Sequence, residues 1–207
     1  MNSRRNMSLF IVLPVLCLFL GTARASELVV TGLEPKNSSG DFFGPSYEVT
    51  LNGLFRICDV SILRVSNSSL LKMPSYLSRA GKDYPVVVIT NREALEDIKD
   101  SILKGRVSRS FKARSVQFDV RDVKRFYDKG ELKAFVWVSF YDTLSVQLSI
   151  FESDGRSRVS WPGYNENGAW KEQVVLLDNK TKNEVESAVM KRFISKRRQN
   201  RQEESEE

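Results

Sequence analysis

The side chains available for chemistry in this chain are limited by the complete absence of histidine among its 207 residues. Without histidine, the commonest general base, the usual zinc ligand and every Ser–His or Cys–His nucleophile pair are excluded. Carboxylate pairs remain, Asp97 with Asp100 and Glu184 with Glu186, but both lie in helical patterns flanked by lysines, which is typical of a solvated face. No phosphate-binding or dinucleotide-binding motif is present. The sequence therefore predicts a protein that is not an enzyme and uses no cofactor or metal, with a carboxylate-dependent hydrolase as a weak alternative.

Two basic segments are candidates for binding an anionic polymer. The candidate residues are Arg109, Lys112 and Arg114 in the first segment and Lys191, Arg192, Lys196, Arg197, Arg198 and Arg201 in the second. Clustered lysine and arginine side chains can neutralise phosphates. Nucleic acid, lipid headgroups and acidic envelope polymers all offer such charge. The alternative role is to keep a linker and a tail soluble.

Aromatic and basic side chains also gather around two Pro-x-Tyr turns. The candidate recognition residues are Tyr76, Arg79 and Lys82 near the first turn and Trp161, Tyr164 and Trp170 near the second. Large aromatic side chains are more often buried, so packing is the main alternative. Loops held on a rigid sheet would suit recognition of a protein partner.

The first 25 residues have the pattern of a secretory signal. Arg4 and Arg5 precede an apolar stretch at residues 9–20, and Ala23-Arg24-Ala25 is a small-x-small cleavage site. Twelve apolar residues are too few for the roughly 20 that a membrane-spanning helix needs. We therefore predict export to the periplasm or beyond, and a cytoplasmic location if this interpretation fails.

Cleavage of this signal changes two global properties of the chain. It removes three arginines and no acid, leaving 29 basic against 26 acidic residues, so the net charge falls from +6 to +3. It also leaves Cys58 as the only remaining cysteine, and a single cysteine cannot form an intramolecular disulfide. We expect Cys58 to be a small buried core residue.

The sequence repeats a pattern of residues at an offset of 88. This offset superposes Ser61-Ile62 on Ser149-Ile150, and also Pro74 on Pro162, Tyr76 on Tyr164, Val86-Val87 on Val174-Val175 and Asn91 on Asn179. A fixed offset with a shared order of patterns indicates duplication.

Each repeat is predicted to be a small antiparallel sheet followed by one helix, so the fold class is α+β. In the first repeat, strands are expected at residues 28–33, 47–51, 54–65 and 84–89, with Asn52-Gly53 as a hairpin turn. In the second, they are expected at residues 116–120, 132–141, 144–150 and 173–177. Capping boxes, Thr90 with Glu93 and Thr181 with Glu184, predict the helix starts.

These patterns divide the chain into five segments. They are a signal peptide at residues 1–25, a first unit at 26–104, a basic linker at 105–115, a second unit at 116–194 and a charged disordered tail at 195–207.

Both units resemble the SpoVG family of bacterial stage V sporulation proteins and septation regulators. The second unit carries Gly130-Glu131-Leu132-Lys133-Ala134-Phe135 and Ala188-Val189-Met190-Lys191-Arg192-Phe193, similar to the opening strand and closing helix of that family. The first carries Leu71-Lys72-Met73-Pro74-Ser75, similar to its Met-Pro-Ser turn. The two stretches cover most of the chain after the signal.

The resemblance implies a sheet with a packed helix, dimerisation through strands, and nucleic-acid binding linked to septation and gene expression. It places phosphate contacts on basic residues near the closing helix. Two copies in one chain suggest an intramolecular pseudo-dimer, or else a homodimer. The chain departs from the family in its export signal, its duplication and its Trp161-Pro162-Gly163 in place of Met-Pro-Ser. The alternative is an exported envelope or protein-interaction module that has lost nucleic-acid binding.

Overall fold

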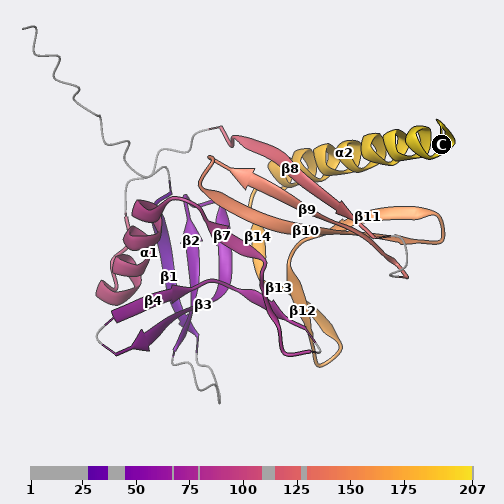
Figure 1. Ribbon diagram of the computed structural model, residues 1–207. Coiled ribbons are helices and arrows are strands. Elements are labelled where there is room, and N and C mark those ends of the chain that lie inside the picture. The colour runs from indigo at the N-terminus through magenta and orange to yellow at the C-terminus, as the bar shows by residue number, and fades with distance from the viewer. Residues whose placement is uncertain are drawn as a thin grey trace, which may run out of the picture.

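The two halves of the chain contain the same elements in the same order (Figure 1). The computed structural model describes residues 28–36, 45–66, 68–78, 80–108, 115–126 and 130–206, with side chains of the last helix as far as Gln199. The predicted α+β class is confirmed.

The first half consists of seven strands and one helix among the described residues. They are β1 (Val30–Lys36), β2 (Ser46–Leu51), β3 (Phe55–Val65), β4 (Ser68–Lys72), β5 (Ser75–Leu77), β6 (Asp83–Pro85), β7 (Val87–Ile89) and α1 (Arg92–Lys104). The β2–β3 hairpin turns at Asn52-Gly53 as predicted, with both residues at positive φ.

The second half repeats this series. Its elements are β8 (Phe118–Arg125), β9 (Leu132–Phe140), β10 (Leu144–Ser153), β11 (Arg156–Ser160), β12 (Gly163–Glu166), β13 (Ala169–Glu172), β14 (Val174–Leu176) and α2 (Asn179–Glu206). Here Tyr141 and Asp142 take the positive-φ positions of the turn that Asn52 and Gly53 occupy in the first half.

Each half completes the sheet of the other. The first sheet contains β1, β2, β3 and β4, and its fifth strand is β14, whose Val175 is paired with Arg56 of β3. The second sheet contains β8, β9, β10 and β11, and its fifth strand is β7, whose Val88 is paired with Ser145 of β10. The exchange is therefore reciprocal.

The two sheets share one hydrophobic core. The inner faces of both sheets, the apolar sides of α1 and α2 and the ring of Trp161 form a single cluster of buried side chains. Phe55 of the first sheet and Phe140 of the second meet edge to face, with ring centroids 4.8 Å apart. The order of elements repeats as expected, but neither half closes its own sheet or its own core.

Both predicted capping boxes need correction. Helix α1 is capped by Asn91, whose side chain accepts hydrogen bonds from the backbone N–H groups of Glu93 and Ala94. The hydroxyl of Thr90 instead donates to backbone carbonyls of the other half, at 2.9 Å from Asp142 O. At the start of α2, the side chain of Asp178 accepts the backbone N–H of Thr181 at 3.0 Å.

The end of the chain also differs from the prediction. Residues 195–206 continue α2 as helix, where the sequence predicted a disordered tail. Figure 1 shows this helix running along the second sheet to the C-terminus. The signal peptide and most of the basic linker, including Arg109, Lys112 and Arg114, lie outside the described residues.

Candidate functional site

The basic residues of α2 separate into exposed cations and anchoring cations. Lys191, Arg192 and Arg198 are exposed. Among the side chains that the structure describes, no carboxylate forms an ion pair with any of the three. Lys191 and Arg198 are seven residues apart, which places them on one side of the helix about 10.5 Å apart along its axis. We call these three residues the α2 cations.

Lys196 and Arg197 attach the helix to the second sheet instead. The Lys196 ammonium donates to the backbone carbonyl of Val123 at 2.9 Å. The Arg197 guanidinium lies 3.5 Å from the carboxylate of Glu152. Both side chains are therefore engaged within the protein, which argues against the prediction that Lys196 and Arg197 bind a partner. The side chain of Arg201 lies outside the described part of α2.

Trp161, predicted as a possible recognition residue, is a core residue. Its side chain is 3% exposed, and its indole N–H donates to Glu186 at 2.9 Å. Packing, the alternative stated for such aromatics, describes it correctly.

The first Pro-x-Tyr turn leads into a hairpin, β5–β6, whose aromatic residues are open to solvent. Tyr76 and Tyr84 face each other across the two strands and are 57% and 43% exposed. The Lys82 ammonium lies 5.2 Å from the centre of the Tyr84 ring, a cation–π contact. Arg79 lies outside the described residues.

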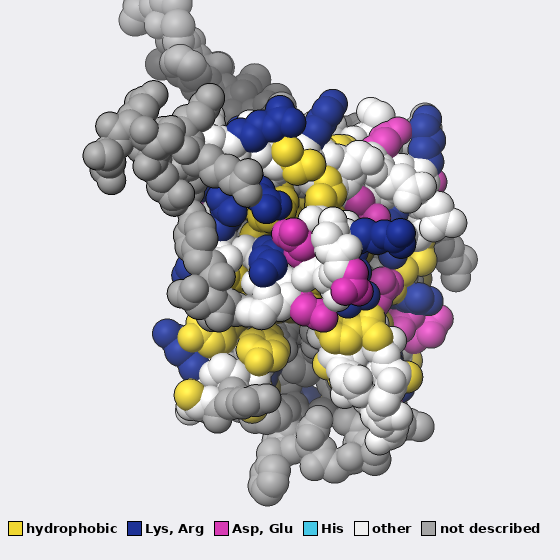
Figure 2. Space-filling view, turned by 90° about the vertical axis from the view of Figure 1, so that its right-hand side faces the viewer, with side chains coloured by type: hydrophobic (Ala, Val, Ile, Leu, Met, Phe, Trp, Pro, Cys, Tyr) yellow, Lys and Arg dark blue, Asp and Glu magenta, His cyan; other side chains and the backbone are white. Residues whose placement is uncertain are grey.

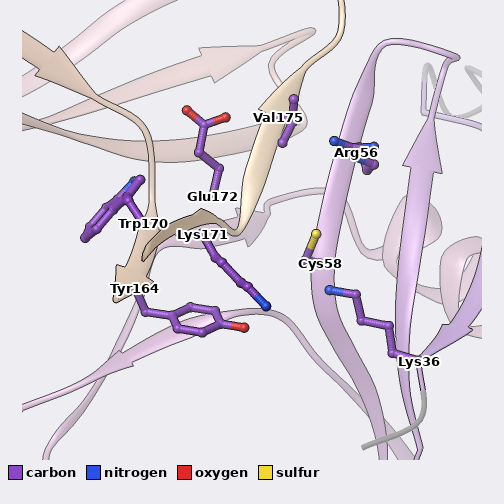
Figure 3. Close-up of a pocket in the computed structure, with 8 residues that line it drawn as sticks. All are labelled: Lys36, Arg56, Cys58, Tyr164, Trp170, Lys171, Glu172 and Val175. Carbon is purple, nitrogen blue, oxygen red and sulfur yellow. The ribbon is translucent and has the colours of Figure 1, made fainter. Parts of the chain in front are cut away.

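The second turn leads into the β12–β13 hairpin, which forms one side of a cavity of about 420 Å³. Tyr164, Trp170, Lys171 and Glu172 line it from the hairpin. Lys36, Arg56, Cys58 and Val175 line it from the outer face of the first sheet. Figure 3 shows the amines of Lys171 and Lys36 directed toward the space beneath Cys58, and the ring of Tyr164 beside Lys171.

The indole of Trp170 packs closely against Gly163 of the opposite strand. A Cβ added at Gly163 would lie 2.9 Å from the indole ring and 2.4 Å from the Lys171 carbonyl oxygen. Only glycine leaves room for this contact. The indole is 54% exposed on its outer side.

The charges around the cavity are balanced within the protein. Lys36 is paired with Asp59 at 3.8 Å, Arg56 with Glu48 at 3.6 Å and Lys171 with Glu166. Burial by itself lowers the pKa of the Lys36 amine, but negative charge on Cys58, Asp59 and Glu48 raises it overall. The hydrogen bond and charge of Glu166 raise the pKa of Lys171. Because each of these cations already has a carboxylate partner, the cavity offers little free positive charge for an anionic ligand.

Aromatic side chains also occupy the outer face of the second sheet, which the sequence predictions did not single out. Phe135 and Trp137 alternate with the buried residues of β9, and Phe151 follows the last buried residue of β10. All three are partly exposed and lie outside the hydrophobic core. Phe126, just after β8, meets Phe135 edge to face at 5.1 Å.

Basic residues lie beside these rings. Lys124 of β8 is paired in register with Phe135. Arg158 of β11 is paired with Phe151, and its guanidinium lies 5.6 Å from the centre of that ring. We call Phe135, Trp137 and Phe151, with Lys124 and Arg158, the aromatic face.

Three of the four carboxylates that remained as catalytic candidates have structural contacts. Asp100 accepts a hydrogen bond from Lys104, which lowers the pKa of its carboxyl group. Glu184 is paired with Lys180 at 4.0 Å, and Glu186 accepts the indole N–H of Trp161. In the described residues, no cluster of acidic residues and cysteine has metal-binding geometry.

In the described part of the chain, no helix combines the length and the apolar character needed to span a membrane. Comparison of the chain with models of protein families, with curated proteins and with solved structures gives no match.

Proposed function

We propose that this protein is a non-enzymatic binding protein that binds nucleic acid through the α2 cations. The observation that carries the proposal is the exposure of Lys191, Arg192 and Arg198 on a helix that is firmly held. Unpaired cations can exchange their counterions for phosphates without first breaking an internal ion pair. The resemblance of both halves to septation regulators supports the same partner and adds a role in septation and gene expression.

The anchoring of α2 supports this proposal because it fixes where the cations lie. Phe193 is 2% exposed between Lys191 and Arg198, and Lys196 and Arg197 join the same region of the helix to the second sheet. Rigid presentation reduces the entropy lost when the cations engage a ligand. Acidic side chains lie between the basic ones on the face that Figure 2 shows, which limits the extent of any uniformly basic surface there.

The reciprocal exchange of β7 and β14 supports an intramolecular pseudo-dimer. Two copies of one unit, each supplying a strand to the other, are the arrangement that a strand-mediated dimer would leave after fusion of its chains. On this proposal the chain needs no second copy to complete its fold.

Neutralising the α2 cations tests the proposed function. The triple variant Lys191→Gln, Arg192→Gln, Arg198→Gln is compared with Arg92→Gln, Lys104→Gln, Arg106→Gln, which removes the same charge from exposed residues in and just after α1. Binding to a DNA duplex is measured by fluorescence anisotropy as a function of salt. We expect the α2 variant to lower the salt slope by about 2 to 3, and the α1 variant to leave it nearly unchanged.

Lys196 and Arg197 are left intact because their substitution would also loosen the helix. Equal slopes for the two triple variants, or no binding of the native protein at low salt, would refute nucleic-acid binding by the α2 cations.

The second candidate function is a protein-interaction module of the cell envelope. The exposed Tyr76, Leu77 and Tyr84 of β5–β6 favour it, since exposed aromatic clusters are typical of protein-binding surfaces. Fractionation of cells that produce the full chain separates the two functions. Recovery in the periplasm favours the envelope role, and recovery in the cytoplasm favours the nucleic-acid role.

A further inference from the structure

We infer that the aromatic face of the second sheet binds single-stranded nucleic acid by stacking bases on Phe135, Trp137 and Phe151. This inference rests on the proposed function for the class of partner, and it adds a second surface and the single-stranded form of the ligand.

The spacing of the rings fits separated bases. Phe135 and Trp137 are two residues apart in β9, so their side chains leave the same face of the sheet about 6.6 to 6.8 Å apart. Phe151 lies on the neighbouring strand, two residues beyond Ser149, which is the register partner of Phe135. Sheets that carry two or three such rings bind unstacked bases of single strands, one ring to a base.

Polar side chains separate the rings on this face. Gln147 and Ser149 of β10 are the register partners of Trp137 and Phe135, and both are partly exposed. Amide and hydroxyl groups can donate to and accept from base edges. Hydrogen bonds of this kind would orient a base that is stacked on the adjacent ring.

The charge of the face complements a phosphate backbone. Lys124 and Arg158 lie beside Phe135 and Phe151, and no described carboxylate forms an ion pair with either cation. They differ in this from Lys36, Arg56 and Lys171 around the cavity, each of which has a carboxylate partner. A neutral sugar chain can also stack on aromatic rings, but it would leave these two cations unused.

Stacking also selects the form of the nucleic acid. In a duplex the faces of the bases are covered by their neighbours, whereas a single strand can turn its bases onto protein rings. The α2 cations contact phosphates only and do not distinguish the two forms. The two surfaces should therefore respond differently to duplex and single strand.

The direct test replaces each ring by leucine, which keeps an apolar side chain and removes the π-face. Phe135→Leu, Trp137→Leu and Phe151→Leu are compared with Trp170→Leu, which removes an exposed ring from the β12–β13 hairpin. The probe is a thymidine homopolymer about 12 nucleotides long. We expect each aromatic-face variant to weaken binding on the order of tenfold, and Trp170→Leu to have little effect.

Tryptophan fluorescence gives a second readout that does not depend on affinity. The chain has three tryptophans, of which Trp161 is buried. In a Trp170→Phe protein, Trp137 is therefore the tryptophan that a ligand can reach. The homopolymer should quench its emission, and a saturating homopolymer that leaves the emission unchanged would overturn the inference.

The charged residues are tested separately. Lys124→Gln and Arg158→Gln should each lower the salt slope for the homopolymer by about 0.7 and leave duplex binding unchanged. If ring variants weaken the homopolymer and the duplex equally, the stacking inference is wrong.

These experiments separate failure of the inference from failure of the proposed function. Loss of duplex binding in the α2 triple variant, together with unchanged homopolymer binding in all ring variants, would refute the aromatic face alone. Loss of homopolymer binding in the ring variants, with no effect of the α2 triple variant on either ligand, would refute the α2 cations alone. Ring-dependent retention on a neutral polysaccharide, with no binding of the homopolymer, would also overturn the inference.

Discussion

Cys58 shows how position changes the role of a single side chain. It was expected in the core because it alternates with Val60 and Ile62, and it is 8% exposed. Its thiol nevertheless lies on the outer face of the first sheet, where it lines the cavity and lies 3.5 Å from Glu48 Oε2. Burial raises the pKa of this thiol above its ordinary value of 9.0, and the charge of Glu48 adds to the shift.

This shift predicts a loss of stability in alkali. A thiol whose pKa is higher in the folded than in the unfolded state stabilises the fold fully below its unfolded pKa, and this contribution disappears as the pH rises through the folded pKa. We expect the free energy of unfolding of the native protein to fall faster above about pH 8.5 to 9 than that of Cys58→Ala. Urea denaturation between pH 7 and 10 measures both.

The difference between the two proteins reports the thiol together with its charge coupling to Lys36, because negative charge on Cys58 raises the pKa of the Lys36 amine. Parallel pH profiles would show that Cys58 ionises as easily in the folded as in the unfolded chain.

Single-residue predictions from sequence were weakest where two neighbours have the same chemical ability. Thr90 and Asn91 can both cap a helix, and the spacing of Thr90 to Glu93 favoured the wrong one. The choice depends on Asp142 and Thr143, whose carbonyls accept the Thr90 hydroxyl. Those residues are about fifty positions away, and no local pattern contains them.

At the scale of the element, α2 combines an anchoring side with exposed basic side chains. Val185, Val189 and Phe193 are buried at helical spacing and form the anchoring side. Beyond Phe193 the apolar pattern ends, which led to the prediction of a disordered tail. The helix continues because Lys196 and Arg197 hold it by polar contacts, which an apolar periodicity does not detect.

Phe193 and Ile194 provide a matched test of this anchoring. Phe193→Ala should lower the free energy of unfolding by about 3 to 5 kcal/mol, because the ring is 2% exposed. Ile194→Ala should change it by less than about 0.5 kcal/mol, because Ile194 is 44% exposed. Chemical denaturation gives both values, and limited proteolysis should cut the end of α2 faster in Phe193→Ala alone. If the two substitutions lowered the free energy of unfolding by similar amounts, Phe193 would not lie on the side of α2 that packs against the sheet.

The aromatic face was accessible to sequence reasoning but was missed. Residues 132–141 are almost all apolar, so alternation in that strand did not show which side chains point outward. The neighbouring strand resolves the ambiguity, since its alternation of Leu144, Val146, Leu148 and Ile150 fixes the inner face. Extending the same alternation places Phe151, and through the register Phe135 and Trp137, on the outer face.

At the scale of the whole molecule, the repeat predicted the order of elements but not the exchange. Val86-Val87 and Val174-Val175 read as short buried strands in either arrangement. Whether such a strand pairs within its own half or with the other depends on the path of the preceding hairpin. That path depends on three-dimensional packing, and the spacing of apolar residues in the sequence does not reveal it.

The exchange predicts that neither half folds alone as a monomer. A chain of residues 26–108 lacks β14 and the second half of the shared core, and a chain of residues 115–207 lacks β7 and the first half. Each should show little cooperative unfolding alone, because an unpaired strand edge and exposed core are costly. Mixed in equal amounts, the two should form a one-to-one complex with the circular dichroism of the full chain. Cooperative unfolding of either fragment as a monomer would contradict this account.

The pairing of β14 with β3 also constrains how the protein is made. A ribosome completes β1 to β4 long before it reaches Val174. Residues 55–57 of β3, which β4 does not cover, therefore lack their strand partner on that edge while residues 73–173 are made. The first sheet of the nascent polypeptide therefore stays incomplete until β14 has been made. Such a delay leaves a holding chaperone ample time to bind the uncovered part of this edge.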